Sequence, residues 1–315
     1  MPSCPRSLLL TIDAFGTLFH PRQPVPDQYA AAAYRFGIPR SAVTPDSLKT
    51  AFKAEFKAQA KARPNYGRDA VLQGQYGGPR QWWEELIRAS FARAMTPTRA
   101  ARNVDLPDGL IQHLLDRFAS KEGYALYDDV EPFLKRVRCA KTHEGPLGPF
   151  ERVLVGVISN SDDRVPAVLE SLGLRVGSCR ADEDISSLKL PGFEERVETA
   201  SRADCLGDYD NAVCDIDLVI TSYEAGEEKP NSHIFDVARR QSIRLATQGK
   251  GLNADAAGSW TCIHVGDDYD KDYQAATNAG WSAYFLPRNG EGSSRDGARS
   301  IRSLMDLIPE IESYE

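Results

Sequence analysis

The chain has 315 residues, of which 42% are apolar and 26% charged, and its 38 basic and 45 acidic side chains give a net charge of -7. This composition is ordinary for a folded globular protein and excludes a wholly disordered chain or a coiled coil. The acidic excess argues against a broad basic face, so we expect no nucleic-acid partner.

The N-terminal apolar run, residues 8–12, is interrupted by Asp13. It is too short to span a membrane and lacks the basic flank and cleavage site of a signal peptide. We therefore expect an intracellular protein, cytoplasmic or nuclear, with no membrane partner. The six cysteines include no CxxC pair and the five histidines do not cluster with them, so neither a zinc site nor a disulfide framework is predicted.

Five short apolar runs predict buried strands, at residues 8–13, 153–160, 218–222, 261–267 and 282–286. Their hydrophobicity is nearly continuous, as is typical of parallel strands covered on both faces. Helical patterns at 163–172, 232–242 and 271–279 separate them. The alternation predicts an α/β fold, a doubly wound and mostly parallel Rossmann-like sheet. The polar residues that end these strands should converge at one edge of the sheet.

The long stretch between the first two strands predicts helices and shows no convincing strand. Thr44 has the character of an N-cap, and Pro45 that of a first helical residue. We place a helical cap at 20–125, inserted after the first strand, and the α/β core at 1–19 and 126–315. The apolar stripes of these helices are interpreted as packing faces rather than as a ligand-binding box.

Residues 176–215 carry 10 acidic and 4 basic side chains, a net charge of -6. The segment has few large apolar groups, which favours a mobile acidic surface loop. A surface for a protein partner is the second interpretation. Since this segment supplies -6 of the total of -7, only -1 is left for the other 275 residues.

Four polar groups at strand ends are candidates for chemistry. Asp13 precedes a glycine-containing turn, Ser159 and Asn160 follow the second strand, Lys229 precedes a proline, and acids at 267–272 follow the fourth strand. Each group also has a simpler structural explanation, as a turn, a helix cap or a surface charge. Carboxylates at the last position suit a hard cation such as Mg²⁺.

The order and spacing of the four groups resemble the haloacid dehalogenase-like hydrolase superfamily, and the resemblance covers nearly the whole chain. It implies that Asp13 is a nucleophile that forms a covalent aspartyl intermediate. It also implies that Ser159 is catalytic, that Thr17 and Asn160 bind substrate, and that Lys229 neutralises Asp13 and the charge developing on the substrate. The substrate would be a small phosphorylated metabolite.

The same resemblance implies a magnesium ion as cofactor. Asp13, the backbone carbonyl of Phe15 and Asp267 would bind it, with Asp268 and Asp272 as further acids beside the ion or behind its ligands. Phosphatases of the family carry an aspartate two residues after the nucleophile, which protonates the leaving oxygen. Phe15 occupies that position here, which predicts weakened hydrolysis of alkyl phosphates.

Three functions stay open at this point. The first is a Mg²⁺-dependent hydrolase of the phosphatase type acting through Asp13. The second is a catalytically impaired member of the family that serves as a binding or regulatory module. The third is a 2-haloacid dehalogenase, because an aromatic residue at position 15 resembles those enzymes, although they work without metal.

Overall fold

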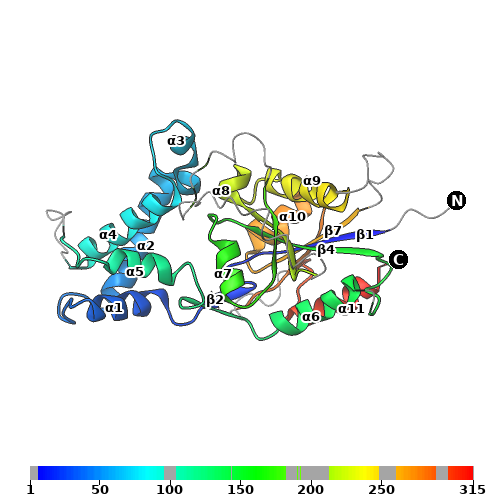
Figure 1. Ribbon diagram of the computed structural model, residues 1–315, viewed down its shortest axis with the longest axis horizontal. Helices are drawn as coiled ribbons and strands as arrows, with labels where there is room; N and C mark the ends of the chain where they lie inside the picture. Colours follow the sequence, from blue (N-terminus) through cyan, green and yellow to red (C-terminus); the bar gives the residue numbers. More distant parts are fainter. Residues whose placement is uncertain are drawn as a thin grey trace, which may run out of the picture.

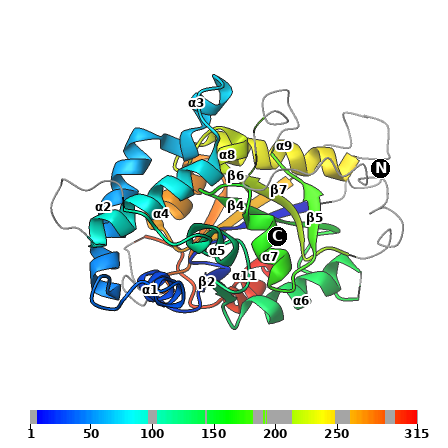
Figure 2. The ribbon, with the colours of Figure 1, turned by 60° about the vertical axis from the view of Figure 1, so that its left-hand side comes forward.

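A six-stranded parallel sheet forms the centre of the molecule (Figure 1, Figure 2). The computed structural model describes residues 6–95, 104–142, 144–181, 190, 192, 213–247, 260–288 and 297–314. The strand order is β5-β6-β4-β1-β7-β8, and every neighbouring pair is parallel. The strands are β1 (Ser7–Ile12), β4 (Arg152–Ser159), β5 (Val176–Cys179), β6 (Ile216–Thr221), β7 (Trp260–Gly266) and β8 (Ser282–Phe285). The predicted α/β, Rossmann-like fold is confirmed.

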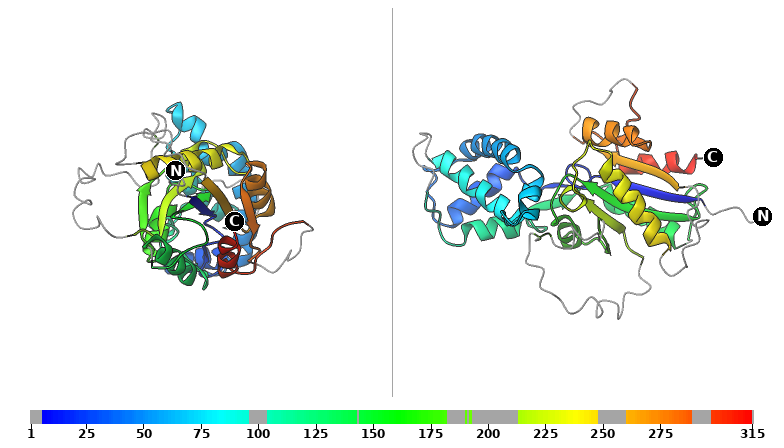
Figure 3. Two further views of the ribbon diagram at one scale, coloured as in Figure 1. Left: turned by 90° about the vertical axis from the view of Figure 1, so that its right-hand side faces the viewer. Right: turned by 90° about the horizontal axis from the view of Figure 1, so that it is seen from above.

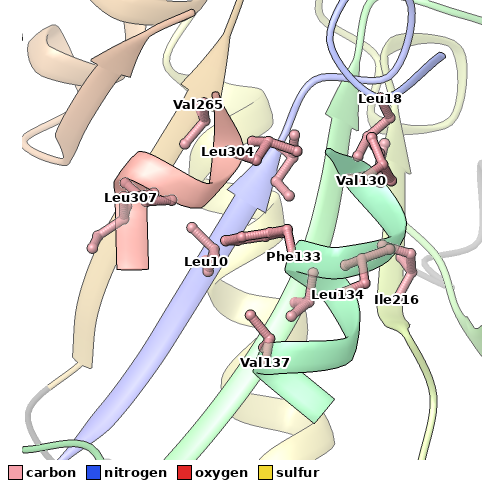
Figure 4. Close-up of a cluster of buried hydrophobic side chains, with 14 of the residues drawn as sticks. Leu10, Leu18, Val130, Phe133, Leu134, Val137, Ile216, Val265, Leu304 and Leu307 are labelled. Carbon is pink, nitrogen blue, oxygen red and sulfur yellow. The ribbon is translucent and has the colours of Figure 1, made fainter. Parts of the chain in front are cut away.

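Side chains of the central strand β1 enter the two cores on opposite faces of the sheet. Leu8, Leu10 and Ile12 belong to one buried cluster and Leu9 to another, as expected for side chains that alternate along a strand. Figure 4 shows part of the first cluster, where Phe133 lies against Leu10. With both faces of β1 buried, the near-continuous apolar run in its sequence is explained.

Helices cover both faces of this sheet. The first core contains side chains from α6 (Val130–Lys141), α7 (Val165–Ser171) and α11 (Leu307–Glu312), and the second contains side chains from α9 (His233–Thr247) and α10 (Ala275–Asn278). The predicted helix at 271–279 is in fact a π-helix, Tyr269–Gln274, followed by α10. Among the described residues, no helix is long and apolar enough to cross a membrane.

The segment between β1 and β4 forms a separate helical lobe (Figure 3). We call it the helical insertion; it consists of α1 (Val25–Arg35), α2 (Pro45–Ala62), α3 (Arg68–Leu72), α4 (Pro79–Met95) and α5 (Leu110–Arg117). Its helices bury a cluster of their own, which includes Leu48, Phe91 and Leu114. The predicted cap of α2 is present, because the hydroxyl of Thr44 accepts a hydrogen bond from the backbone N–H of Ser47.

The expectation of no strand between β1 and β4 was wrong. Two short strands, β2 (Phe19–Pro21) and β3 (Tyr124–Leu126), pair in antiparallel register where the chain leaves and re-enters the core. Three residues are too few to produce a recognisable alternating pattern, which is why the sequence did not indicate them. The predicted boundaries at 20 and 125 lie within this ribbon.

The prediction of a loop across 176–215 was wrong at both ends of the segment. Its first four residues form the edge strand β5, whose Gly177 and Ser178 give no apolar signal. At the other end Asp215 is buried, and its carboxylate pairs with Arg138 and Arg175. Apart from 190 and 192, residues 182–212 lie outside the described part of the chain, so the predicted mobile loop and partner surface stay predictions.

Candidate active site

Three carboxylates meet at the carboxyl edge of the sheet. Asp13 follows β1 and Asp267 follows β7, and these two strands are neighbours. The backbone N–H of Asp13 donates to the carbonyl of Val265 at 2.8 Å, which extends the strand pairing up to the carboxylates. Asp272 joins them from the π-helix. One oxygen from each of Asp13, Asp267 and Asp272 lies within 4.8 Å of the others, so the predicted convergence of these residues is observed.

Two glycines make this close approach possible. A Cβ atom on Gly16 would lie 2.5 Å from a carboxylate oxygen of Asp267, and the φ of Gly16 is +90°, a left-handed conformation that side chains disfavour. A Cβ atom on Gly266 would lie 2.1 Å from the carboxyl carbon of Asp272. Both positions therefore require the absence of a side chain, which the sequence alone could not distinguish from an ordinary turn glycine.

Lys229 neutralises part of this charge. Its Nζ donates to Asp13 Oδ1 at 2.6 Å, to Asp272 Oδ1 at 2.5 Å and to the carbonyl of Ile158 at 2.9 Å. The residue is only 3% exposed, so all three donors of the ammonium group are used inside the protein. Although burial lowers the pKa of Lys229, the two carboxylates raise it above its ordinary value. Lys229 is thus charged at neutral pH. It differs from an ordinary surface lysine in being buried and fully hydrogen-bonded by the protein.

The pKa values of Asp13 and Asp272 shift in opposite directions. Burial raises the pKa of Asp13 to about 7, and the neighbouring Asp272 adds to the shift while Lys229 opposes it. Burial also acts to raise the pKa of Asp272, but Lys229 and His264 outweigh it and hold that pKa below its ordinary value. The pKa of Asp13 thus lies above that of an ordinary aspartate, a departure that is common among groups at functional sites.

A buried histidine lies behind Asp272. His264 Nε2 is 3.3 Å from Asp272 Oδ1, and His264 Nδ1 is 2.8 Å from the hydroxyl of Thr11. Burial lowers the pKa of His264, so the ring is neutral at pH 7. A neutral ring that donates from Nε2 to the carboxylate leaves Nδ1 to accept from Thr11. The role of Thr11 gave no signal in the sequence, because a threonine inside a strand is commonplace.

The two residues predicted to bind substrate have side chains that hydrogen-bond to the protein, and their role toward a substrate stays a prediction. The buried hydroxyl of Thr17 donates to Asp267 Oδ1 at 3.0 Å and accepts from the backbone N–H of Asp267 at 3.1 Å. The side-chain amide of Asn160 donates to the carbonyl of Lys229 at 2.8 Å and accepts from the N–H of Lys229 at 2.7 Å. In this geometry Thr17 positions Asp267, and Asn160 positions Lys229.

Asp268, which was predicted as a further acid near the ion, serves as a helix cap. Asp268 Oδ1 accepts hydrogen bonds from the backbone N–H groups of Asp270 and Lys271, both at 3.0 Å. Its carboxylate therefore caps the π-helix, while its own N–H donates to Asp272 Oδ2 at 2.9 Å. Thr221, at the end of β6, accepts from the N–H of Glu224 and caps the short helix α8 (Ser222–Ala225).

A cavity of about 320 Å³ lies between the helical insertion and the core, beside the residues that flank Asp13. On the core side it is lined by Ala14, Phe15, Ser159 and Asn160. Nine aromatic side chains of the described residues line it: Phe15, Phe19, Tyr29, Phe52, Phe56, Tyr66, Trp83, Phe118 and Tyr124. The interpretation of the apolar stripes as packing faces was thus incomplete, because α2, α4 and α5 also line a space that can hold a ligand.

The charged side chains lining this cavity, within the described residues, are Asp162 and Arg164. The guanidinium of Arg164 pairs with Asp162 through Nε and Nη2, both at 2.8 Å, and lies 4.6 Å from the ring centre of Trp83. Trp83 Nε1 donates to Asp162 Oδ2 at 2.7 Å, and Arg164 Nη1 donates to the carbonyl of Phe118 at 3.3 Å. This buried pair, which the sequence analysis missed, connects the core to the helical insertion.

A second connection lies close to the first, since the ring centre of Tyr66 is 6.3 Å from that of Trp83. Asn65 and Tyr66 have positive φ angles of 45° and 60°, which is unusual for residues other than glycine. In this conformation Asn65 Nδ2 donates to the carbonyl of Ser222 at 2.8 Å, and the hydroxyl of Ser222 donates back to Asn65 Oδ1 at 3.0 Å. The strained turn thus holds the insertion against α8, next to the segment that carries Lys229.

The carboxylate cluster has the chemistry of a magnesium site. Asp13, Asp267 and Asp272 bring three negative charges against the single positive charge of Lys229, and carboxylate oxygens are ligands that Mg²⁺ prefers. Both oxygens of Asp272 are already occupied, by Lys229 and by the N–H of Asp268. The donor set therefore fits Mg²⁺ held by Asp13 and Asp267, with Asp272 behind them. The carbonyl of Phe15 as a ligand stays a prediction.

Comparison with protein-family models found no match. Among curated proteins, an uncharacterized hydrolase of Schizosaccharomyces pombe is 28% identical over 277 residues, which cover 88% of this chain and 89% of that protein. The human haloacid dehalogenase-like hydrolase domain-containing protein 3 is 25% identical over 312 residues, which cover 98% of this chain and 94% of that protein. Over nearly its whole length the chain is thus similar to proteins named as haloacid dehalogenase-like hydrolases. The resemblance predicted from the four motifs is confirmed.

Two solved structures match nearly the whole chain at low sequence identity. A 2-haloacid dehalogenase from Pseudomonas syringae is 16% identical, with a TM-score of 0.47 and coverage of 96% of both chains. A HAD-hydrolase from Bacillus subtilis, solved with bound magnesium, is 13% identical, with a TM-score of 0.46 and coverage of 98% of this chain and 99% of that one.

Proposed function

We propose that this chain is a Mg²⁺-dependent hydrolase of the phosphatase type, which cleaves a small phosphorylated metabolite through Asp13. The observation that carries the proposal is the buried bridge from Lys229 Nζ to Asp13 at 2.6 Å and to Asp272 at 2.5 Å. A carboxylate poised next to a fixed cation can attack an anionic phosphoryl group without prohibitive charge repulsion. The curated relative named as a hydrolase is consistent with this class of reaction.

The residues of the cluster have separate tasks in this proposal. Asp13 attacks phosphorus, the bond from phosphorus to the ester oxygen breaks, and water then releases phosphate from the aspartyl intermediate. Lys229 balances the charge that builds up on the phosphoryl oxygens, and Ser159, buried at the end of β4, hydrogen-bonds the transferred group. Bound Mg²⁺ would supply further positive charge at these oxygens, held by Asp13 and Asp267.

We also propose that the helical insertion acts as a cap that closes over this site and excludes water. Three features support the proposal: the insertion has its own hydrophobic cluster, it joins the core through the β2–β3 ribbon, and it hydrogen-bonds to the core through Asn65 and Trp83. Such a lobe can move as a unit about its connection.

Phe15 sets the expected substrate preference. Its side chain is 51% exposed and lines the cavity at the position where the family's phosphatases carry an acid. General acid catalysis contributes about 10²–10⁴-fold, so alkyl esters should react slowly. Phe15→Asp should raise kcat on alkyl phosphates more than on aryl phosphates.

A panel of phosphate esters and 2-haloacids, assayed with and without Mg²⁺, tests the function. Wild type should release phosphate only with Mg²⁺, and Asp13→Asn should lower kcat by at least about 10³-fold. Phosphate release that is equal in Asp13→Asn would remove the enzyme proposal and leave the alternative of a binding or regulatory protein. Halide release that needs no metal and survives Asp267→Ala would instead identify a 2-haloacid dehalogenase.

A further inference from the structure

The shape and lining of the cavity limit what can depart from the phosphorus. The space of about 320 Å³ is the size of a pocket for one small organic molecule. Among the aromatic residues that line it, Phe15 lies closest in sequence to Asp13, and its ring packs edge-on against Phe19 and Tyr124, with ring centres 6.1 and 6.0 Å away. Deeper in the insertion, Phe56 of α2 packs edge-on against Trp82 and contacts Trp83. Flat apolar walls of this kind favour an aromatic ring as occupant.

The same lining offers no suitable proton donor for a departing alkoxide among the described residues. The carboxyl group of Asp162 accepts hydrogen bonds from Arg164 and Trp83, and these partners hold its pKa below the ordinary value despite burial. Burial raises the pKa of Tyr124 to about 12 and that of Tyr66 further still. A leaving group must therefore depart as an anion without a proton from the protein, which a phenol does far more readily than an aliphatic alcohol.

One polar group in this wall is available to a ligand. The hydroxyl of Ser161 is buried and has no hydrogen-bond partner within the described residues, although Ser161 lines the cavity. A buried hydroxyl without a partner is costly unless a ligand or a water satisfies it. Arg164 cannot serve an anionic leaving group in the same way, because its guanidinium already pairs with Asp162 on two nitrogens.

We propose that the substrate is a phosphate ester of a phenol, whose ring occupies the cavity between the insertion and the core while Ser161 hydrogen-bonds a polar atom of that ring system. This inference rests on the proposed function. In the first step an oxygen of Asp13 bonds to phosphorus, and the aryl oxygen leaves with the electron pair of the broken bond. In the second step water attacks phosphorus, the bond to Asp13 breaks, and the products are inorganic phosphate and, after uptake of a proton from solvent, the phenol.

The test compares 1-naphthyl phosphate with glycerol 3-phosphate in two measurements. One is kcat/KM of the Mg²⁺-loaded wild type, which should favour the naphthyl ester by about 100-fold. The other is the affinity of the Asp13→Asn protein for each ester by calorimetry, which should favour the naphthyl ester by at least about tenfold without any turnover. Phe56→Ala removes one wall of the cavity at a residue that is 40% exposed, and should reduce both preferences about tenfold.

Phe36→Ala is the matched control, since Phe36 belongs to the same insertion and is not among the residues lining the cavity. It should leave both preferences unchanged. Val25→Trp is a second test, because Val25 is a half-buried residue at the start of α1 that lines the cavity, and a tryptophan there would fill it. This variant should lower the affinity for the naphthyl ester only.

The two proposals fail in different ways. Equal kcat/KM and equal affinity for the two esters, with hydrolysis still dependent on Asp13 and Mg²⁺, would overturn the aromatic subsite and leave the phosphatase proposal standing. Absence of hydrolysis for both esters would remove the phosphatase proposal and with it the aryl phosphate as a substrate. Preferences that Phe36→Ala reduces as much as Phe56→Ala would also overturn the subsite, because the effect would then come from general loosening of the insertion.

Discussion

The carboxylate cluster and the aromatic cavity are neighbours built on opposite principles. The cluster belongs wholly to the α/β core, and its geometry follows from strand ends and from direct hydrogen bonds among Asp13, Lys229 and Asp272. The cavity is formed by side chains from both lobes, and its walls are mostly apolar. The difference shows that the charged groups are positioned within one lobe, while the cavity depends on how the two lobes meet.

The largest expected effect comes from removing the charge at the centre of the cluster. Lys229→Met leaves Asp13 and Asp272 buried without their shared partner, so the free energy of unfolding at pH 7 should fall by about 3–5 kcal/mol. Urea denaturation measures it. Lys271→Met is the control, because Lys271 lies in the acidic motif with a side chain 53% exposed and should cost less than about 1 kcal/mol. An equal loss of unfolding free energy in the two variants would mean that the buried bridge stabilises the fold no more than a surface ion pair does.

A smaller effect concerns the pH dependence of stability, which we expect to arise in the cluster and not in the cavity. Because the pKa of Asp13 rises from 3.8 to about 7 on folding, the folded protein holds this proton more tightly than the unfolded chain between these values. Stability is therefore lost as pH rises toward 7, and Asp13→Asn removes that loss. Without metal, the stability advantage of Asp13→Asn over wild type should grow by about 2–3 kcal/mol between pH 5 and pH 8.

Thermal or urea unfolding in a chelating buffer checks this advantage. Saturating Mg²⁺ should reduce it at pH 8, because a bound cation favours the ionised form of Asp13. An advantage that does not change with pH would show that Asp13 titrates normally in the folded protein. No such dependence is expected for Phe56→Ala, because that substitution changes an apolar wall only.

The smallest effect tests the polar link across the cavity. Trp83→Phe deletes the hydrogen bond from Nε1 to Asp162, a bond between the lobes, and should lower stability by about 1–2 kcal/mol. Trp82→Phe deletes a bond to the carbonyl of Arg63, which stays inside the insertion. Hydrogen exchange distinguishes them: Trp83→Phe should speed exchange at the core segment around Asp162, and Trp82→Phe should not. Identical exchange profiles would show that Trp83 does not couple the lobes.

Much of the cluster could be predicted from the sequence because local rules determine it. Asp13 and Asp267 directly follow buried parallel strands, and such strand ends share one edge of a sheet. Lys229 could be predicted as a functional residue only through the resemblance to a family, since a lysine before a proline has no local signature. Its side chain reaches Asp13 across 216 positions of sequence.

The cavity and the commitments of Thr17 and Asn160 could not be predicted, for a different reason. Whether a hydroxyl or an amide faces a ligand or the protein depends on the nearest partner in space, and the partners here are Asp267 and the backbone of Lys229. The Trp83–Asp162 bond likewise joins residues 79 positions apart. The periodicity of the sequence shows that the helices have apolar faces. It does not show where a cavity remains between these faces and the core.

The β2–β3 ribbon brings the two ends of the helical insertion side by side. Residues 19–21 leave the core and residues 124–126 return beside them, paired from Phe19 with Leu126 to Pro21 with Tyr124. A segment of any length or fold can be exchanged between two such points, provided that its own ends lie one strand spacing apart, about 4.8 Å. Grafting another lobe at this ribbon would leave the backbone around Asp13 and Asp267 intact. The carboxylate cluster and the inserted helices that line the cavity can thus be inherited, or engineered, one without the other.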